Sequence, residues 1–225
     1  MKLGTFTRAS GWATLAASLV LGLAATPAVA DGGNGGANGG GWSVSYFTPN
    51  AVSLGATIAL HSTPTIQVPF LAPDRYLALI QGGQSMGLTG NLTGETLSAT
   101  YTIAGVSNDA SFVGNSDQCT PGGNPPSMRL YFATGHSVSR YNLWWADSSA
   151  VDFTGNASGM MTVSLDPSNW SDLYGDSGSN APTQFAAAVA NVTVVGISFG
   201  DGCHYENGVT TSDGSGTFTS QMSVS

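Results

Sequence analysis

The sequence TLSATYTI at residues 96–103 decides the fold, because it alternates apolar or aromatic side chains with hydroxyl side chains without a break. Side chains of a β-strand point alternately to opposite faces. One face of this segment therefore carries Leu97, Ala99, Tyr101 and Ile103, and the other carries three threonines and a serine. The pattern predicts an antiparallel strand with one buried face and one hydrated face.

The rest of the chain consists mainly of short apolar runs separated by Gly, Asn, Asp and Pro. Many short strands with turn signals between them predict an all-β sandwich or barrel. One helix is expected at Pro182–Ala190, since proline suits the first turn and Phe185 and Val189 are four residues apart. The expected strands are Trp42–Phe47, Thr65–Phe70, Thr96–Ile103, Arg129–Ala133, Val138–Trp145, Gly159–Leu165, Val192–Phe199 and Gly216–Val224.

The N-terminus has the pattern of a secretory signal peptide. Lys2 and Arg8 precede the apolar stretch Trp12–Ala25, and Ala28-Val29-Ala30 offers a cleavage site before Asp31. Residues 1–30 are therefore predicted to be the signal peptide. Residues 31–41, DGGNGGANGGG, are expected to form a flexible leader, and residues 42–225 a single domain. We expect a secreted protein, extracellular or periplasmic, with no membrane span after cleavage.

The charge balance narrows the possible partners. The chain has 5 Lys and Arg and 13 Asp and Glu. Without Lys2 and Arg8 it keeps three arginines and no lysine, a net charge of −10. Nucleic-acid binding depends on a Lys/Arg footprint, and docking on anionic lipid depends on basic clusters. Neither class of partner fits this composition.

Two cysteines, Cys119 and Cys203, fit an oxidising compartment. An even count without a close pair predicts one disulfide between distant loops. Its loop-closure contribution to stability would be on the order of 4 kcal/mol.

Three stretches together resemble the laminin B (laminin IV) type domain. They are FLAPDRYL at 70–77, GETLSATY at 94–101, and Asn169-Trp170 followed by the segment from Gln184 to Ile197. The resemblance covers roughly Gln67 to Val224. It implies a jelly-roll sandwich related to galactose-binding-like folds, serving in an extracellular or matrix module without a shared catalytic motif. It supplies no functional residues to transfer.

Hydrolase chemistry is the alternative in the enzyme class. Gly83-Gln84-Ser85-Met86-Gly87 matches the G-x-S-x-G pattern of serine hydrolases, with His136 or His204 as a candidate base. The following residues, LTGNLTG, cannot supply the helix that this motif requires. An acid pair for glycoside hydrolysis would draw on Glu95, Glu206 or the aspartates, most of which occupy turn contexts.

Aromatic side chains suggest a different chemistry. Sugar rings stack their C–H faces on Trp and Tyr, while Asp, Asn and Arg bond their hydroxyls. Strand alternation sends one ring of Trp144-Trp145 inward and the other outward. Trp170 matches a structural tryptophan of the laminin B pattern and is expected in the core. The candidate ligand-binding residues are Tyr141, Trp144, Trp145, Tyr174 and Tyr205.

A structural calcium ion is the one cofactor that the sequence suggests, because loops rich in Asp and Asn supply oxygen ligands. The candidate ligands are Asp172 and Asp176 near Trp170, and Asp201 and Glu206 near Cys203. The leading functional prediction is a secreted, non-catalytic module that binds a neutral glycan or an extracellular matrix or surface component. The alternatives are a secreted hydrolase and a self-assembling envelope protein.

Overall fold

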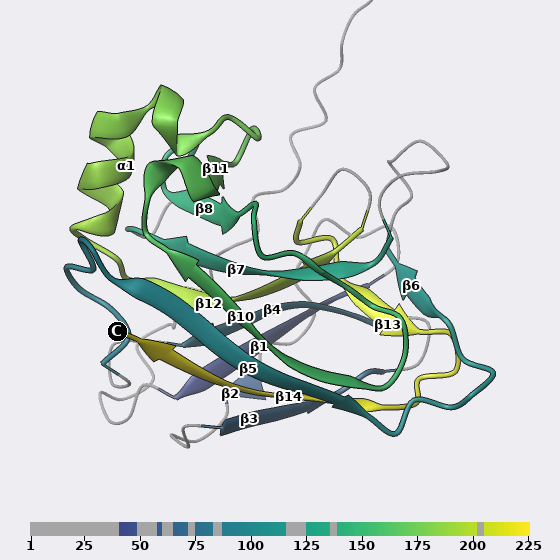
Figure 1. The fold of residues 1–225 in the computed structure, drawn as a ribbon. Coiled ribbons are helices and arrows are strands. Elements are labelled where there is room, and N and C mark those ends of the chain that lie inside the picture. Colours follow the sequence, from purple (N-terminus) through teal and green to yellow (C-terminus); the bar gives the residue numbers. More distant parts are fainter. Residues whose placement is uncertain are drawn as a thin grey trace, which may run out of the picture.

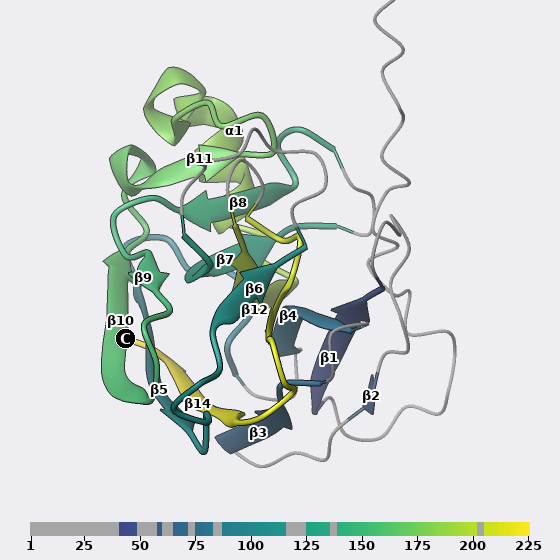
Figure 2. The same ribbon diagram turned by 90° about the vertical axis from the view of Figure 1, so that its right-hand side faces the viewer.

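The computed structural model describes residues 41–48, 58–59, 65–71, 75–82, 87–115, 125–135, 139–201 and 205–225. Its strands form two antiparallel sheets that face each other (Figure 1). The view turned by 90° shows the smaller sheet on one side and the larger sheet on the other (Figure 2). The predicted fold class, an all-β antiparallel sandwich with one short helix, is confirmed.

The smaller sheet contains residues 96–103, the segment with the alternating apolar and hydroxyl side chains. Its order is β10 (Ala157–Ser164), β5 (Thr96–Ala104), β14 (Thr217–Val224) and β3 (Thr65–Pro69). In β5, Leu97, Ala99 and Ile103 are buried against the opposite sheet. On the outer face Thr102 pairs with Ser158 of β10 and Thr219 of β14, so hydroxyl groups line up across the strands.

The larger sheet carries the rest of the strands. Its central path runs β11 (Trp170–Asp172), β8 (Leu143–Ala146), β7 (Ser127–Ala133), β12 (Val194–Gly200), β4 (Tyr76–Gly82), β1 (Trp42–Phe47) and β2 (Ile58–Ala59). Three short strands attach to this path, namely β6 (Phe112–Gly114), β9 (Val151–Asp152) and β13 (Val209–Thr211).

An aromatic cluster closes one end of the sandwich beneath α1 (Pro182–Val189). The ring of Phe185 meets Trp144 edge-on at 5.0 Å between centroids, and Phe132 meets Trp170 at the same distance. Edge-to-face pairs of this kind add to the stabilisation from burial. Trp170 is fully buried, in agreement with its expected place in the core.

Most predicted strands are confirmed within one or two residues at each end. The strand predicted at Val138–Trp145 was wrong in its first half, because the structure has a turn before Leu143 in which Asn142 N donates to Ser139 O. The helix predicted at Pro182–Ala190 is α1. The prediction omitted β2, β4, β6, β9, β11 and β13.

The outer face of the larger sheet, turned away from the smaller one, carries a second apolar cluster. It comprises Phe47, Ala78, Leu79, Tyr131, Ala133, Leu143 and Trp145. Trp144 points into the sandwich and Trp145 into this outer cluster, as strand alternation predicts. Tyr205, from the loop between β12 and β13, packs against the cluster, and this contact positions the site described below.

No helix in the described part of the chain is long and apolar enough to cross a membrane. Several predictions fall outside the described residues. These are the signal peptide, all of the leader except Gly41, the Cys119–Cys203 disulfide, and the hydrolase candidates Ser85, His136 and His204.

Candidate ligand-binding pocket

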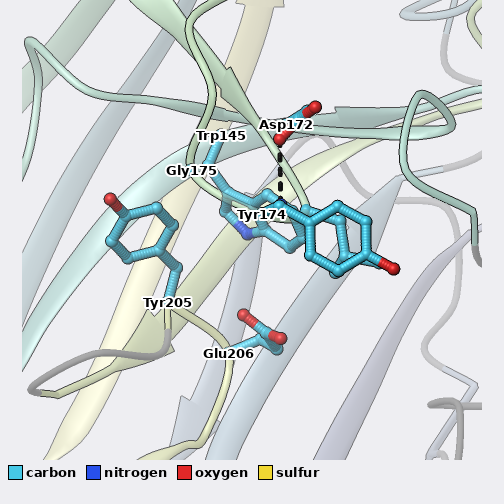
Figure 3. A pocket seen from close by; sticks show the side chains of 7 residues that line it. Trp145, Asp172, Tyr174, Gly175, Tyr205 and Glu206 are labelled. Carbon is cyan, nitrogen blue, oxygen red and sulfur yellow. Dashed lines mark hydrogen bonds between the residues drawn. The ribbon is translucent and has the colours of Figure 1, made fainter.

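A pocket of about 190 Å³ opens on the outer side of the larger sheet (Figure 3). Strand β8 supplies Trp145 and strand β11 supplies Asp172. The remaining lining residues come from the turn after β11 and from the loop between β12 and β13. They are Leu173, Tyr174, Gly175, Tyr205 and Glu206. Segments far apart in the sequence therefore meet in one small site.

The turn after β11 is built around the carboxylate of Asp172, which is 1% exposed. Its Oδ1 accepts hydrogen bonds from the backbone N–H groups of Tyr174 at 2.9 Å and Asp176 at 3.0 Å. Gly175 adopts φ +80°, a conformation that glycine takes without strain. The result is a tight turn that presents the ring of Tyr174 to solvent, with 72% of the residue exposed.

Arg140 holds this turn from outside. Its Nε donates to Asp172 Oδ2 at 2.7 Å, and its Nη2 pairs with Asp176. The guanidinium also lies 5.2 Å from the ring centre of Tyr141 and 5.6 Å from that of Tyr174, within range of cation–π attraction. Both oxygens of Asp172 are therefore committed to protein donors.

Trp145 forms the floor of the pocket and is 3% exposed. Its ring centre lies 6.1 Å from that of Tyr205, and the two ring planes make an angle of 60°. The guanidinium of Arg129 sits 4.2 Å from the centre of the Tyr205 ring. Within the described structure, the buried indole Nε1 of Trp145 has no hydrogen-bond partner. In Figure 3 this nitrogen edge faces the side of the pocket where Tyr205 and Glu206 lie.

The carboxyl group of Glu206 points toward the indole of Trp145 (Figure 3). Burial raises the pKa of Glu206 to about 7, although backbone hydrogen bonds from Glu206 and Tyr205 act in the opposite direction. Among the described residues no basic side chain contributes to this pKa. Glu206 therefore changes charge near neutral pH while facing an aromatic floor.

The structure brings together three of the five predicted ligand-binding aromatics, Trp145, Tyr174 and Tyr205. The other two lie elsewhere. Trp144 is fully buried in the sandwich core, and Tyr141 is partly buried and stacks on Trp144 at 6.4 Å. Neither ring lines the pocket.

The predicted calcium ligands divide in the same way. Asp172 and Glu206 line the pocket, whereas Asp176 pairs with Arg140 beside it. Asp201 lies against Gly114 of β6, where a side chain on that glycine would overlap the Asp201 carboxylate. Over the described residues, no three His, Cys, Asp or Glu side chains gather as metal ligands would. Arg140 and two backbone N–H groups already use three of the about four acceptor sites of the Asp172 carboxylate, so a cation would compete with them.

The acid pair suggested for glycoside hydrolysis is not assembled in this pocket. Glu95 precedes β5 in the smaller sheet, where its carbonyl accepts from Leu165 N, and it does not line the pocket. Glu206 has Asp172 as the nearest acidic partner along the pocket lining, but that carboxylate points away from the pocket toward its own turn (Figure 3).

Sequence reasoning missed the role of Arg140, which organises the site from outside the pocket. A signal was available, because Arg140 is one of three arginines in the predicted mature chain and directly precedes the candidate Tyr141. No family model, curated protein or solved structure matches this chain. The resemblance to the laminin B type domain therefore stays a prediction.

Proposed function

We propose that this chain is a secreted, non-catalytic binding module that holds a neutral glycan in the pocket walled by Tyr174 and Tyr205. The observation that carries the proposal is the exposure of Tyr174 directly beside an aromatic floor. A large aromatic ring left open to water at 72% exposure gains free energy by covering its face. The apolar C–H face of a sugar ring offers such a cover.

The rigidity of the turn favours binding. Tyr174 follows a buried aspartate whose two oxygens fix the turn and bind Arg140. A turn whose backbone is fixed before the ligand arrives loses little conformational freedom on binding. The volume of about 190 Å³ is well below the roughly 300–1,000 Å³ typical of pockets for drug-sized ligands, so it suits about one sugar unit of a longer chain.

The polar groups at the rim suit a neutral ligand with hydroxyl groups. Glu206 can accept or donate a hydrogen bond near neutral pH, and the tyrosine hydroxyls do both. Arg140 is already paired with Asp172 and Asp176, so this arginine is not available to an anionic ligand.

The predicted Cys119–Cys203 disulfide would fit an extracellular setting. The described residues that flank the two cysteines favour this disulfide. Gly114, five residues before Cys119, lies against Asp201, two residues before Cys203. The chain therefore leaves both described segments from neighbouring points. Mass spectrometry of the alkylated mature protein, with and without reductant, tests the Cys119–Cys203 bond.

A glycan array probed with the mature chain tests the proposal. We expect selective binding to neutral oligosaccharides that Tyr174→Ala abolishes. Met160→Ala is the matched control, because Met160 is also a large exposed side chain (66%) but lies on β10 of the other sheet. Binding at background level, or equal loss in both variants, would overturn the proposal.

A further inference from the structure

We propose that the corner of this pocket formed by Trp145, Tyr205 and Glu206 binds a methylated ammonium group. This inference goes beyond the glycan site and rests on the proposed function only in placing both ligands in one pocket. Tyr174 forms the exposed lip, whereas the corner lies over the buried floor. The methylated ammonium group belongs either to a substituent of the bound sugar or to a separate small molecule.

The aromatic rings supply the first part of the argument. The face of an aromatic ring is electronegative and attracts a cation within about 6 Å of its centre. Rings around this pocket already do so, since Arg129 lies 4.2 Å from Tyr205 and Arg140 lies 5.6 Å from Tyr174. Trp145 and Tyr205 meet at 60°, so they form two walls rather than a closed stack. Two such walls with an acid beside them are the arrangement that recognises quaternary ammonium groups.

The charges around the corner supply the second part. Arg140 is paired with two aspartates, and Arg129 interacts with Asp147. Glu206 has no such partner in the described part of the chain. When Glu206 is ionised, two positive side chains therefore stand against four negative ones among the described residues, counting the two arginines beside the pocket rings, their acidic partners and Glu206. The six residues are Arg129, Arg140, Asp147, Asp172, Asp176 and Glu206. This excess favours a cation.

Hydrogen bonding decides which cation fits. A primary ammonium has three N–H donors that each need an acceptor. The oxygens of Asp172 are already committed, and Glu206 already accepts from backbone N–H groups. A methylated ammonium needs no acceptor and presents an apolar surface to the rings. The small volume of the pocket also suits a compact head group.

The buried indole of Trp145 points to the same ligand. Its Nε1 is enclosed without a hydrogen-bond partner among the described residues, and its nitrogen edge faces Glu206 (Figure 3). An ionised carboxylate is a stronger acceptor for this N–H than a protonated one. A cation in the corner favours the ionised form of Glu206, whose carboxylate then lies on the side of the pocket that this N–H edge faces (Figure 3).

This coupling predicts a pH dependence for a ligand whose own charge is fixed. The groups that face Glu206 are Trp145 on β8, Tyr174 and Asp172 on the β11 side, and Tyr205 on its own loop. Because the pKa of Glu206 in the free protein is about 7, the carboxyl is mostly protonated at pH 5 and ionised at pH 8.5. We expect the affinity for the cation to be roughly tenfold higher at pH 8.5 than at pH 5.

The experiment compares choline with 3,3-dimethylbutan-1-ol, which has the same shape without the charge. Both are titrated into the mature chain at pH 5 and pH 8.5 by calorimetry and tryptophan fluorescence. We expect choline to bind better at pH 8.5 and the neutral alcohol to bind at least tenfold more weakly. Glu206→Gln should remove the preference of choline binding for pH 8.5 over pH 5. Glu95→Gln, which deletes a carboxylate near β5, should preserve that pH preference. Phosphatidylcholine vesicles form a second arm, because co-sedimentation would assign the group to a lipid head group.

Equal binding of the two compounds, no binding of choline at millimolar concentration, or an equal effect of Glu206→Gln and Glu95→Gln would overturn this inference. The choline titration and the glycan array together distinguish failure of the ammonium site from failure of the glycan site. Glycan binding without choline binding would leave the proposed function standing and remove the ammonium site. Choline binding with no glycan bound on the array would leave the ammonium site standing and remove the glycan proposal.

Discussion

Arg140 and Asp172 form the ion pair that shapes the candidate site, with 2.7 Å between Arg140 Nε and Asp172 Oδ2. The other oxygen of the same carboxylate accepts the backbone N–H groups of Tyr174 and Asp176. One buried side chain therefore connects an arginine before β8 with the turn that presents the exposed tyrosine. The stability of the turn and the position of Tyr174 depend on the same contacts.

Replacing Asp172 with alanine should destabilise the fold. The substitution removes the acceptor for two backbone N–H groups and for Arg140, and buried donors left without an acceptor cost about 1–3 kcal/mol. We expect a loss of about 2–3 kcal/mol in the free energy of unfolding, measured by urea denaturation. Asp176→Ala is the control. Its carboxylate is 53% exposed, so its loss should cost less than about 1 kcal/mol. Equal costs for the two variants would contradict this role for Asp172.

Phe185 should be a large contributor to the core at the α1 end. It is buried and meets both Trp144 and Phe132 edge-on. Phe185→Ala leaves a cavity among these rings, and such truncations cost about 3–5 kcal/mol. The neighbouring Gln184 is exposed on the same helix, so Gln184→Ala should change the thermal or urea midpoint very little. A mild effect of Phe185→Ala would show that the helix does not close the core.

Gly196 on β12 is required by close packing across the larger sheet. A Cβ at this position would overlap the carbonyl oxygen of Ile80 and lie 2.6 Å from Cε1 of Tyr131. We expect Gly196→Ala to destabilise the fold by about 1–3 kcal/mol or more, measured by chemical denaturation. Gly159→Ala gives a comparison, since its Cβ would meet the ring end of Tyr101, a partly exposed side chain that can move. A smaller loss is expected there, and the reverse order would refute the packing argument.

Glu206 should make stability depend on pH. Its pKa is about 7 in the folded chain against an ordinary value of 4.5, so the folded state keeps a proton that the unfolded chain has lost. The contribution of Glu206 to the free energy of unfolding is therefore highest below pH 4.5, and it falls as pH rises to about 7. The full difference corresponds to roughly 3 kcal/mol, which the partial exposure of Glu206 reduces.

Glu206→Gln checks that dependence. Glutamine cannot ionise, so the stability of the variant relative to the wild type should increase between pH 5 and pH 8, as measured by urea midpoints in matched buffers. Glu95→Gln should show no such trend, because it lies beside the smaller sheet. A constant difference between Glu206→Gln and wild type across this range would argue against a raised pKa of Glu206 in the folded chain.

The fold was predictable where local periodicity reflects burial. The alternation in β5 and β14 gave both the strands and their buried faces, and the pair Trp144-Trp145 was correctly placed on opposite faces of β8. Strand β4 was missed as part of the sandwich because both of its faces are covered. Its run of buried residues, Leu77–Ile80, shows no alternation. Such runs do not distinguish a buried strand from a buried helix.

The site was only partly predictable because it depends on tertiary contacts. Trp145, Tyr174 and Tyr205 were candidates as individual aromatic residues, yet no pattern in the chain relates residue 145 to residue 205. They meet because Tyr205 lies in the loop that returns over the outer face of β7 and β8. Trp144 looked equally suitable in the sequence, but packing against Phe132 and Phe185 buries it.

The most direct test of the glycan site is an NMR titration of the isotope-labelled mature chain with the best oligosaccharide from the array. A glycan in the pocket should change the chemical shifts of the indole N–H of Trp145 and of the amides of Tyr174, Gly175, Tyr205 and Glu206, all of which line the pocket. Amides of β10 and β5 in the smaller sheet should stay unchanged. Shift changes centred on the outer face of that smaller sheet, with the pocket resonances unmoved, would contradict glycan binding in this pocket.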